Sequence, residues 1–163
     1  MDFQHLHCHS HFSLLDGLTK LKPLVKAFKQ RGFKAATLTD YGSLYGAIKF
    51  IQTCQAEDIK PILGFEAYIA PRKMSDQDVQ LDKNLFHLVL LAENYEGYKN
   101  LMKLSSLGHL DGFFNGKPRL DKEILKQYSK NIIALSGCIR GEVPQLLKQN
   151  KTEEAKAVTL EYH

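Results

Sequence analysis

The chain has 163 residues, of which 44% are hydrophobic and 25% charged, and its formal net charge is +4. This apolar content is too high, and the charge too mixed, for a disordered protein, and the length suits one domain or part of one. The sequence has no apolar run long enough for a membrane span, no signal-peptide pattern and only three cysteines, which argues against a disulfide framework. We therefore expect a cytoplasmic protein without membrane contact.

Apolar periodicity and turn residues predict a series of alternating strands and helices. The expected elements are, in chain order, a strand over 3–9, a helix from Pro23 to Gly32, a strand over 35–39, a helix over 44–56, a β-rich segment over 61–69, a loop over 71–84, a strand over 87–92, a helix over 95–107, a glycine-rich loop over 111–119, a helix from Asp121 to Tyr128, a strand over 131–136, and helices over 142–149 and from Thr152. This order predicts a parallel α/β arrangement, in which polar residues at the carboxyl ends of strands converge.

Four histidines alternate within seven residues, at positions 5, 7, 9 and 11. Alternate side chains of a strand point the same way, so His7 and His9 can reach one ion while Cys8 faces the other side. Imidazole suits zinc, manganese and iron, and carboxylate or thiolate ligands complete such sites. The alternative is an accidental cluster; an expression tag would be contiguous.

Other candidate ligands each have an ordinary structural alternative. Asp16 is a ligand or a turn residue before a glycine. Glu66 lies in a β-rich segment, where a charge needs a metal or a basic partner. A lone His87 at the head of a strand is more often a core or edge histidine, and Cys138 more often a buried free thiol.

Two further features leave their roles open. Asp40 either caps the helix expected near Leu44 or lies behind the metal ligands. Residues 20–34 carry six basic side chains and no acid, which indicates a solvated helix face or, alternatively, a contact with a phosphate backbone. The sequence contains neither a nucleophile elbow nor a P-loop, so serine catalysis and P-loop hydrolysis are unsupported.

Five segments follow one another in the order HLHCHSHFSLLDGL, TLTDYGSLYGAIKF, IKPILGFEAY, FHLVLLAENYEGYKNL and IIALSGCIRGEVPQLL. Together they resemble the PHP (polymerase and histidinol phosphatase) domain family, in the branch found at the N-terminus of bacterial DNA polymerase III alpha subunits. The resemblance runs from Phe3 to about Leu147. It implies an α/β fold of the PHP type, a distorted (β/α)7 barrel similar to a TIM barrel, of which residues 1–163 form only the N-terminal part.

The resemblance also implies a cluster of divalent metals (zinc, manganese or iron) and no catalytic group separate from the metal ligands. The implied ligands are His7, His9, Asp16, Glu66, His87 and Cys138. Asp40 would lie behind them. Tyr41 stands where many family members have a metal-binding histidine, and the family's Asp-x-His motif is absent from this sequence. His5 and His11 lie outside the ligand pattern.

For function, the resemblance implies a fragment of a replicative polymerase, whose nucleotide addition would use magnesium ions outside this chain. The domain itself would be a metal-dependent phosphoesterase, as in 3′–5′ proofreading, or a structural domain that keeps part of the site and docks a separate exonuclease. DNA, that exonuclease subunit and the sliding clamp are the implied partners. A free-standing phosphatase acting on a small phosphomonoester, similar to histidinol phosphatase, is the alternative.

Overall fold

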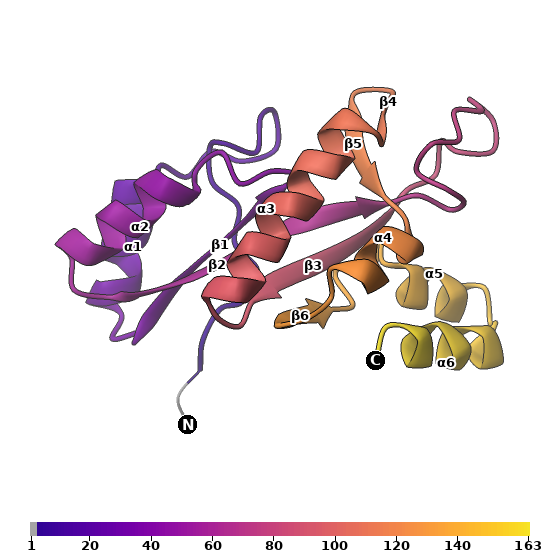
Figure 1. The fold of residues 1–163 in the computed structure, drawn as a ribbon. Helices are drawn as coiled ribbons and strands as arrows, with labels where there is room; N and C mark the ends of the chain where they lie inside the picture. Colours follow the sequence, from indigo (N-terminus) through magenta and orange to yellow (C-terminus); the bar gives the residue numbers. More distant parts are fainter. Residues whose placement is uncertain (1–2) are drawn as a thin grey trace.

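A computed structural model describes residues 3–163, which form a mixed α/β structure (Figure 1). The helices and strands are, in chain order, α1 (Leu21–Gln30), β1 (Ala35–Tyr41), α2 (Ala47–Ala56), β2 (Lys60–Ile69), β3 (Phe86–Ala92), α3 (Tyr95–Leu110), β4 (Phe113–Phe114), β5 (Lys117–Leu120), α4 (Lys122–Gln127), β6 (Ile132–Leu135), α5 (Glu142–Lys148) and α6 (Thr152–Glu161). Among residues 3–163, every helix is too short or too polar to span a lipid bilayer.

The strands form a mixed sheet in the order β4-β5-β2-β3-β6, with β1 also paired to β2. Strands β1 and β5 run parallel to β2, but β3 runs antiparallel to β2 and to β6. The prediction of a parallel arrangement is therefore wrong at β3. Its physical reason lies in residues 71–84, where the predicted loop is confirmed. A parallel neighbour requires a crossover, usually a helix, whereas this loop simply returns the chain along β2.

Helix α3 crosses one face of the sheet and builds the larger core there (Figure 1). Asn94 caps its start by accepting a hydrogen bond from the Gly97 N–H, which satisfies one of the free donors of the first turn. The buried residues of this core are Phe65, Ala67, Ile69, Leu88, Leu90, Leu101, Leu104, Leu120 and Leu125. Because side chains alternate along a strand, this packing sends the intervening residues of β2 and β3 to the opposite face.

That opposite face carries the polar residues. Glu66 and Tyr68 alternate with the core residues of β2, and His87 alternates with those of β3. Tyr41 pairs with Glu66 across β1 and β2, and His87 pairs with Tyr68 across β3 and β2. Paired residues of neighbouring strands share a face, so these four side chains lie together.

Helices α1 and α2 form a second core against β1, and the helices predicted there are confirmed. Its buried members are Leu21, Val25, Phe28, Ala36, Leu38, Phe50, Cys54 and Ile59. Cys8 packs against this cluster from the N-terminal segment. Cys8 and the two flanking histidines therefore point to opposite sides, as the alternation predicts.

The predicted strand over residues 3–9 is wrong, because this segment is extended without regular strand pairing. The Thr39 N–H donates to the Cys8 carbonyl at 2.8 Å, but other contacts use hydroxyl groups. Thr37 Oγ1 donates to the His5 carbonyl, and Thr39 Oγ1 accepts from the Cys8 N–H. Side chains of β1 thus replace a regular backbone ladder.

The glycine-rich loop predicted over 111–119 is instead the hairpin of β4 and β5. Asn115 and Gly116 form its tip with φ angles of 51° and 75°. Positive φ at both central residues is the requirement of a type I′ turn, which suits two antiparallel strands. This Asn-Gly pair was the sequence signal for the hairpin.

Candidate metal centre

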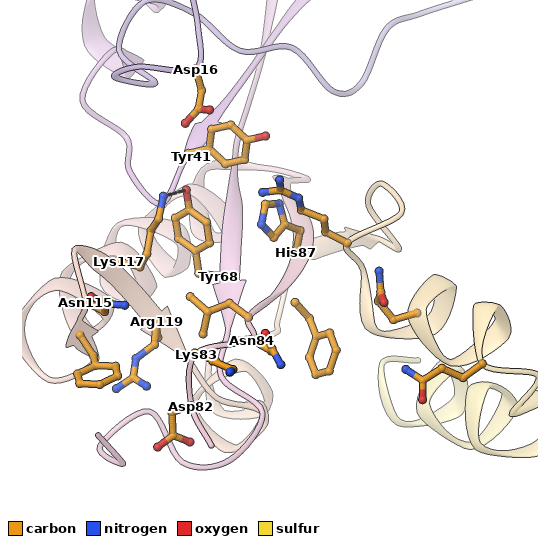
Figure 2. Close-up of a pocket in the computed structure, with 16 residues that line it drawn as sticks. Asp16, Tyr41, Tyr68, Asp82, Lys83, Asn84, His87, Asn115, Lys117 and Arg119 are labelled. Atoms are coloured by element: carbon orange, nitrogen blue, oxygen red, sulfur yellow. Dashed lines mark hydrogen bonds between the residues drawn. The ribbon is translucent and has the colours of Figure 1, made fainter. Parts of the chain in front are cut away.

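A pocket of about 680 Å³ opens on the polar face of the sheet. Tyr41, Tyr68 and His87 line it, and Asp16 lies at one end beside Tyr41 (Figure 2). The helix-covered face supplies the rigidity, because the same strands carry the core on their other side. The pocket therefore rests on strands whose other faces belong to the larger core.

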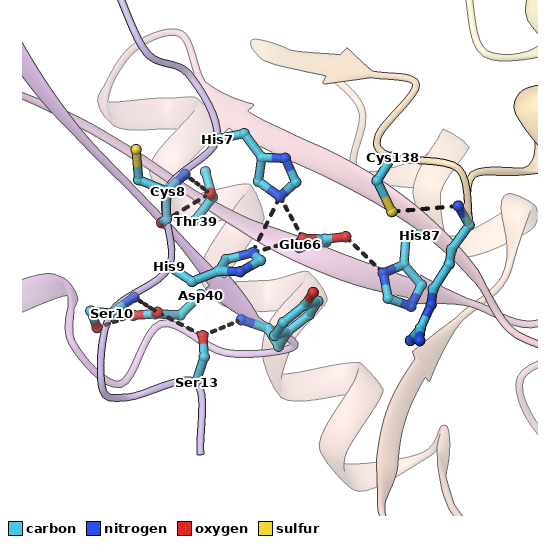
Figure 3. A network of polar contacts seen from close by, with 12 residues as sticks. His7, Cys8, His9, Ser10, Ser13, Thr39, Asp40, Glu66, His87 and Cys138 are labelled. Atoms are coloured by element: carbon cyan, nitrogen blue, oxygen red, sulfur yellow. Dashed lines mark hydrogen bonds and ion pairs between the residues drawn. The ribbon is translucent and has the colours of Figure 1, made fainter. Parts of the chain in front are cut away.

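Glu66 is the centre of the polar network in Figure 3 and is 0% exposed. Its Oε2 accepts from His7 Nε2 at 2.5 Å and from His9 Nε2 at 2.7 Å. Its Oε1 accepts from His87 Nδ1 at 2.7 Å. One buried carboxylate thus contacts histidines from two segments. Its Oε2 contacts those of the N-terminal segment, and its Oε1 contacts the one from β3.

The three histidines reach Glu66 by different routes. His7 and His9 alternate along the extended segment, and their Nε2 atoms lie 3.2 Å apart. His87 is the second residue of β3, and it lies at the end of β2 that carries Glu66 because β3 is antiparallel. The expected convergence therefore occurs, although His87 belongs to the amino end of its strand and not to a carboxyl end.

Two groups of donor atoms share Glu66 and could each hold a metal ion. His7, His9 and Glu66 form one group, and Glu66, His87 and Cys138 form the other, with the donor atoms of each within 4.8 Å of one another. Cys138 Sγ also accepts from the Arg140 N–H at 3.4 Å. Imidazole, carboxylate and thiolate donors fit the borderline-soft divalent ions, such as zinc.

The charge of Glu66 is stabilised despite its burial. Burial alone would raise the pKa of this carboxyl, but hydrogen bonds from His7, His87 and His9 lower the pKa well below its usual range. An ionised carboxylate in the interior needs such partners, since its desolvation is costly. The Glu66 carboxylate therefore stays ionised and can bind a cation.

Asp40 is another buried carboxylate, 1% exposed, and it contacts no histidine in the interactions of the described residues. It accepts from the Ser10 N–H at 2.6 Å, from Ser10 Oγ at 2.8 Å and from Ser13 Oγ at 2.7 Å (Figure 3). The alternative of a helix cap is wrong, because α2 begins after Gly46 without a side-chain cap. Asp40 instead fixes the turn that follows His9.

Tyr41 packs among the candidate ligands. Its ring lies 4.1 Å from the His9 ring and 5.6 Å from the His87 ring, measured between centroids. Burial, together with the charges of Glu66 and Asp16, raises the pKa of Tyr41 to about 12. The phenol is therefore neutral at physiological pH and a poor metal ligand.

Asp16 is exposed and belongs to neither donor group found among residues 3–163. It lies near Tyr41 at the rim of the pocket (Figure 2). Its backbone N–H donates to the Ser13 carbonyl, so the turn alternative for this residue is also satisfied. Of the six predicted ligands, five are thus brought together and Asp16 is set apart.

Sequence reasoning missed the hydroxyl residues that hold the histidine segment in place. Thr39 holds Cys8, and Ser10 and Ser13 hold Asp40. Serines placed close after the histidine run, before an Asp-Gly turn, were the available signal, because such hydroxyls commonly bond to nearby turns. Their acceptor, thirty residues away, was not visible in the sequence.

The PHP domain family matches residues 5–163, and the chain belongs to this family. A relative named DNA polymerase III subunit alpha, from Treponema pallidum (strain Nichols), is 43% identical over 99% of this chain and 14% of that protein. Proteins of the same name from Thermus aquaticus and Helicobacter pylori (strain 26695) are each 44% identical, over 96% and 98% of this chain and 13% and 14% of theirs. The chain thus spans about one seventh of the length of the curated relatives it matches.

Among solved structures, a Bifidobacterium adolescentis protein provisionally named a metal-dependent phosphoesterase resembles part of the chain. The match has a TM-score of 0.45 and 19% identity, over 62% of this chain and 31% of that protein. This likeness is too low to establish a shared barrel. The predicted family is confirmed, and the observed fold is a mixed α/β sheet with helices.

Proposed function

We propose that the chain is the N-terminal part of a bacterial DNA polymerase III alpha subunit and that its PHP domain holds a metal-dependent phosphoesterase site. The relatives of that name support the first part, since their identity extends over nearly the whole chain. The shared carboxylate of Glu66 supports the second part and is the observation on which it depends. Nucleotide addition would use magnesium and residues outside this chain.

The proposed ligands are His7, His9 and Glu66 for one ion, and Glu66, His87 and Cys138 for the other. Asp16 remains a candidate only if its turn approaches the site when an ion is bound. Zinc, manganese and iron all suit this donor set. When bound, such ions lower the pKa of water and stabilise the charge that develops on a phosphoester.

The chain's own residues would prepare the site for that chemistry. Glu66 stays ionised and keeps His7, His9 and His87 oriented through its two oxygens. Arg140, two residues after Cys138, lines the pocket and is available to neutralise a phosphate oxygen. Tyr41 keeps its proton, so it can donate a hydrogen bond to the ligand but cannot serve as a base.

A structural role is the second candidate, and Tyr41 is the observation that favours it. In place of a metal-binding histidine, this phenol offers no good ligand at neutral pH. The domain would then retain part of its metal site, stabilise the polymerase and dock a separate proofreading exonuclease. Either role implies DNA, replicase subunits such as the sliding clamp, a cytoplasmic location and a PHP barrel completed by residues beyond this chain.

A nuclease assay on the full-length protein that contains this chain tests the proposal. The substrates are a 5′-labelled single-stranded oligonucleotide and histidinol phosphate, each with manganese or zinc. We expect shortening of the oligonucleotide from its 3′ end, abolished by Glu66→Gln and unchanged by Glu57→Gln. Bound metal without any hydrolysis would leave the structural role, and cleavage of histidinol phosphate alone would support the free-standing phosphatase.

A further inference from the structure

The pocket extends well beyond the candidate metal ligands. Figure 2 shows Asp16 and Tyr41 at one end and Asp82, Lys83 and Arg119 toward the other. The reaction centred on Glu66 would occupy only the first end. The second end has no role in the proposed hydrolysis, and charged side chains other than the candidate metal ligands line it.

A row of paired residues connects the two ends. His87 of β3 pairs with Tyr68 of β2, and Tyr68 pairs with Arg119 of β5. Paired residues share a face of the sheet. Neighbouring strands lie roughly 4.8 Å apart, so the backbone of Arg119 lies about 10 Å from the backbone of His87. Lys117 lies two residues before Arg119 and therefore projects from the same face of β5.

Cationic side chains outnumber carboxylates around this pocket. Its charged lining comprises Asp16, Asp82, Lys83, Lys117, Arg119 and Arg140. Asp82 is already neutralised, because Arg72 Nε and Nη2 donate to its two oxygens at 2.9 and 2.6 Å. The far end thus carries an excess of positive charge, which favours an anionic ligand.

Arg119 offers a buried donor without a partner. The residue is 0% exposed, and its Nε and Nη2 donate to the carbonyls of Gly112, Met74 and Asp76. Its Nη1 has no hydrogen-bond partner among the described residues, and the guanidinium lies 4.6 Å from the Phe114 ring. A buried unpaired donor is costly, and a ligand oxygen is one way to satisfy it.

Lys117 adds a second donor close to the metal groups. Its Nζ donates to Tyr68 Oη at 3.1 Å and lies 4.7 Å from the centre of that ring. No carboxylate pairs with Lys117 in the described part of the chain. The ammonium keeps further donors for a ligand, because it carries three N–H groups and the phenol uses one.

We propose that the β5 end of the pocket is an anion subsite, in which Lys117 and Arg119 bind a second phosphate of a ligand whose first phosphate lies beside His87. This inference rests on the proposed phosphoester site and adds what that site recognises: a ligand with two phosphate groups. Such a ligand is either a nucleic-acid strand, with its phosphates one nucleotide apart, or a free nucleotide with adjacent phosphates.

Metal-free binding to the full-length protein that contains this chain tests the subsite without any turnover. The probes for calorimetry are thymidine 5′-monophosphate, thymidine 5′-diphosphate and the 5′-phosphorylated thymidine dinucleotide. We expect a probe with two phosphates to bind about 10-fold more tightly than the monophosphate, and its salt dependence to be steeper. Preference for the dinucleotide would identify a strand, and preference for the diphosphate a free nucleotide.

Variants decide whether the named side chains are responsible. Lys117→Met should remove the preference for the second phosphate and leave monophosphate binding within about 2-fold, because the first phosphate does not contact it. Lys103→Met, on the exposed surface of α3, is the matched control. Arg119→Met should act in the same direction as Lys117→Met.

Equal binding of all three probes, or equal losses for all probes in Lys117→Met, would overturn the subsite. Neither result depends on metal or hydrolysis, so the proposed phosphoesterase would still be judged by its own assay.

Discussion

Two buried carboxylates, Glu66 and Asp40, are both withdrawn from water but are satisfied in different ways. Asp40 accepts from a backbone N–H and two serine hydroxyls, all of which are neutral donors. The Glu66 carboxylate accepts, within the described part of the chain, from three imidazoles. A hydroxyl or amide donor holds a turn in place, whereas an imidazole nitrogen can exchange its proton for a metal ion. The difference teaches that the partners of a buried charge, more than its burial, indicate its role.

The largest expected effect follows from replacing the shared carboxylate. Glu66→Gln keeps the shape but removes the charge that both donor groups share, and it replaces one of the two carboxylate oxygens by an amide nitrogen. We expect metal affinity to fall by at least about 100-fold, since even partners behind metal ligands contribute roughly 10- to 100-fold. Titration calorimetry with zinc measures it, with Glu57→Gln as the control. Unchanged affinity would remove Glu66 from the metal site.

Asp40 provides the opposite test. Asp40→Ala leaves the Ser10 N–H and two hydroxyls without their buried acceptor, so we expect a loss of about 3 kcal/mol in the free energy of unfolding. Metal affinity should change by less than about 10-fold, because the Asp40 carboxylate bonds Ser10 and Ser13 and contacts none of the candidate ligands. Urea unfolding measures the first quantity, and exposed Asp111→Ala is the control. Complete loss of metal binding in a folded Asp40→Ala protein would erase the distinction between the two carboxylates.

Substitutions of Tyr41 test whether the site around Glu66 lacks a metal ligand at this position. Tyr41→His places an imidazole against His9, and we expect zinc affinity to rise about 10-fold because a neutral phenol is replaced by a good ligand. Tyr41→Phe keeps the ring and should give no increase. If the phenylalanine variant gained as much as the histidine variant, ring packing and not ligation would explain the change.

The smallest effect concerns pH. The pKa of Glu66 is lowered from its ordinary value of 4.5, so the unfolded chain takes up this proton at higher pH than the folded chain. Its stabilising contribution is therefore complete above about pH 4.5 and is lost as the pH falls toward the lower folded value. Between about pH 4.5 and pH 3, the upper part of that range, thermal unfolding should show a steeper loss of stability for the parent than for Glu66→Gln. Parallel decreases would contradict the lowered pKa.

The sequence alone predicted the parts of this site that depend on local spacing. His7 and His9 alternate around Cys8, and the extended segment preserves that alternation even though it is not a regular strand. The helix predicted from Asp121 is α4, and Asp121 caps it by accepting from the Ile124 N–H. Local pattern was sufficient there because each relation spans only a few residues.

The remaining parts depend on contacts between distant segments. Taken alone, His87 has the pattern of a core or edge histidine, and it reaches Glu66 only because β3 reverses direction along β2. The acceptor role of Asp40 requires Ser10 and Ser13, which lie about thirty residues earlier in the chain. The propensities of single residues contain no information on such pairing. The family resemblance supplied these ligands where spacing could not.

Metal stoichiometry in single-histidine variants tests the shared carboxylate most directly. Native mass spectrometry of the zinc-loaded chain should show that His7→Ala and His87→Ala each lose one of the two sites while retaining the other. Glu66→Gln should lose both, and His11→Ala neither, because the His11 ring contacts the Thr19 carbonyl and not Glu66. If His7→Ala and His87→Ala removed the same single ion, or if Glu66→Gln retained one, Glu66 would not join two metal groups.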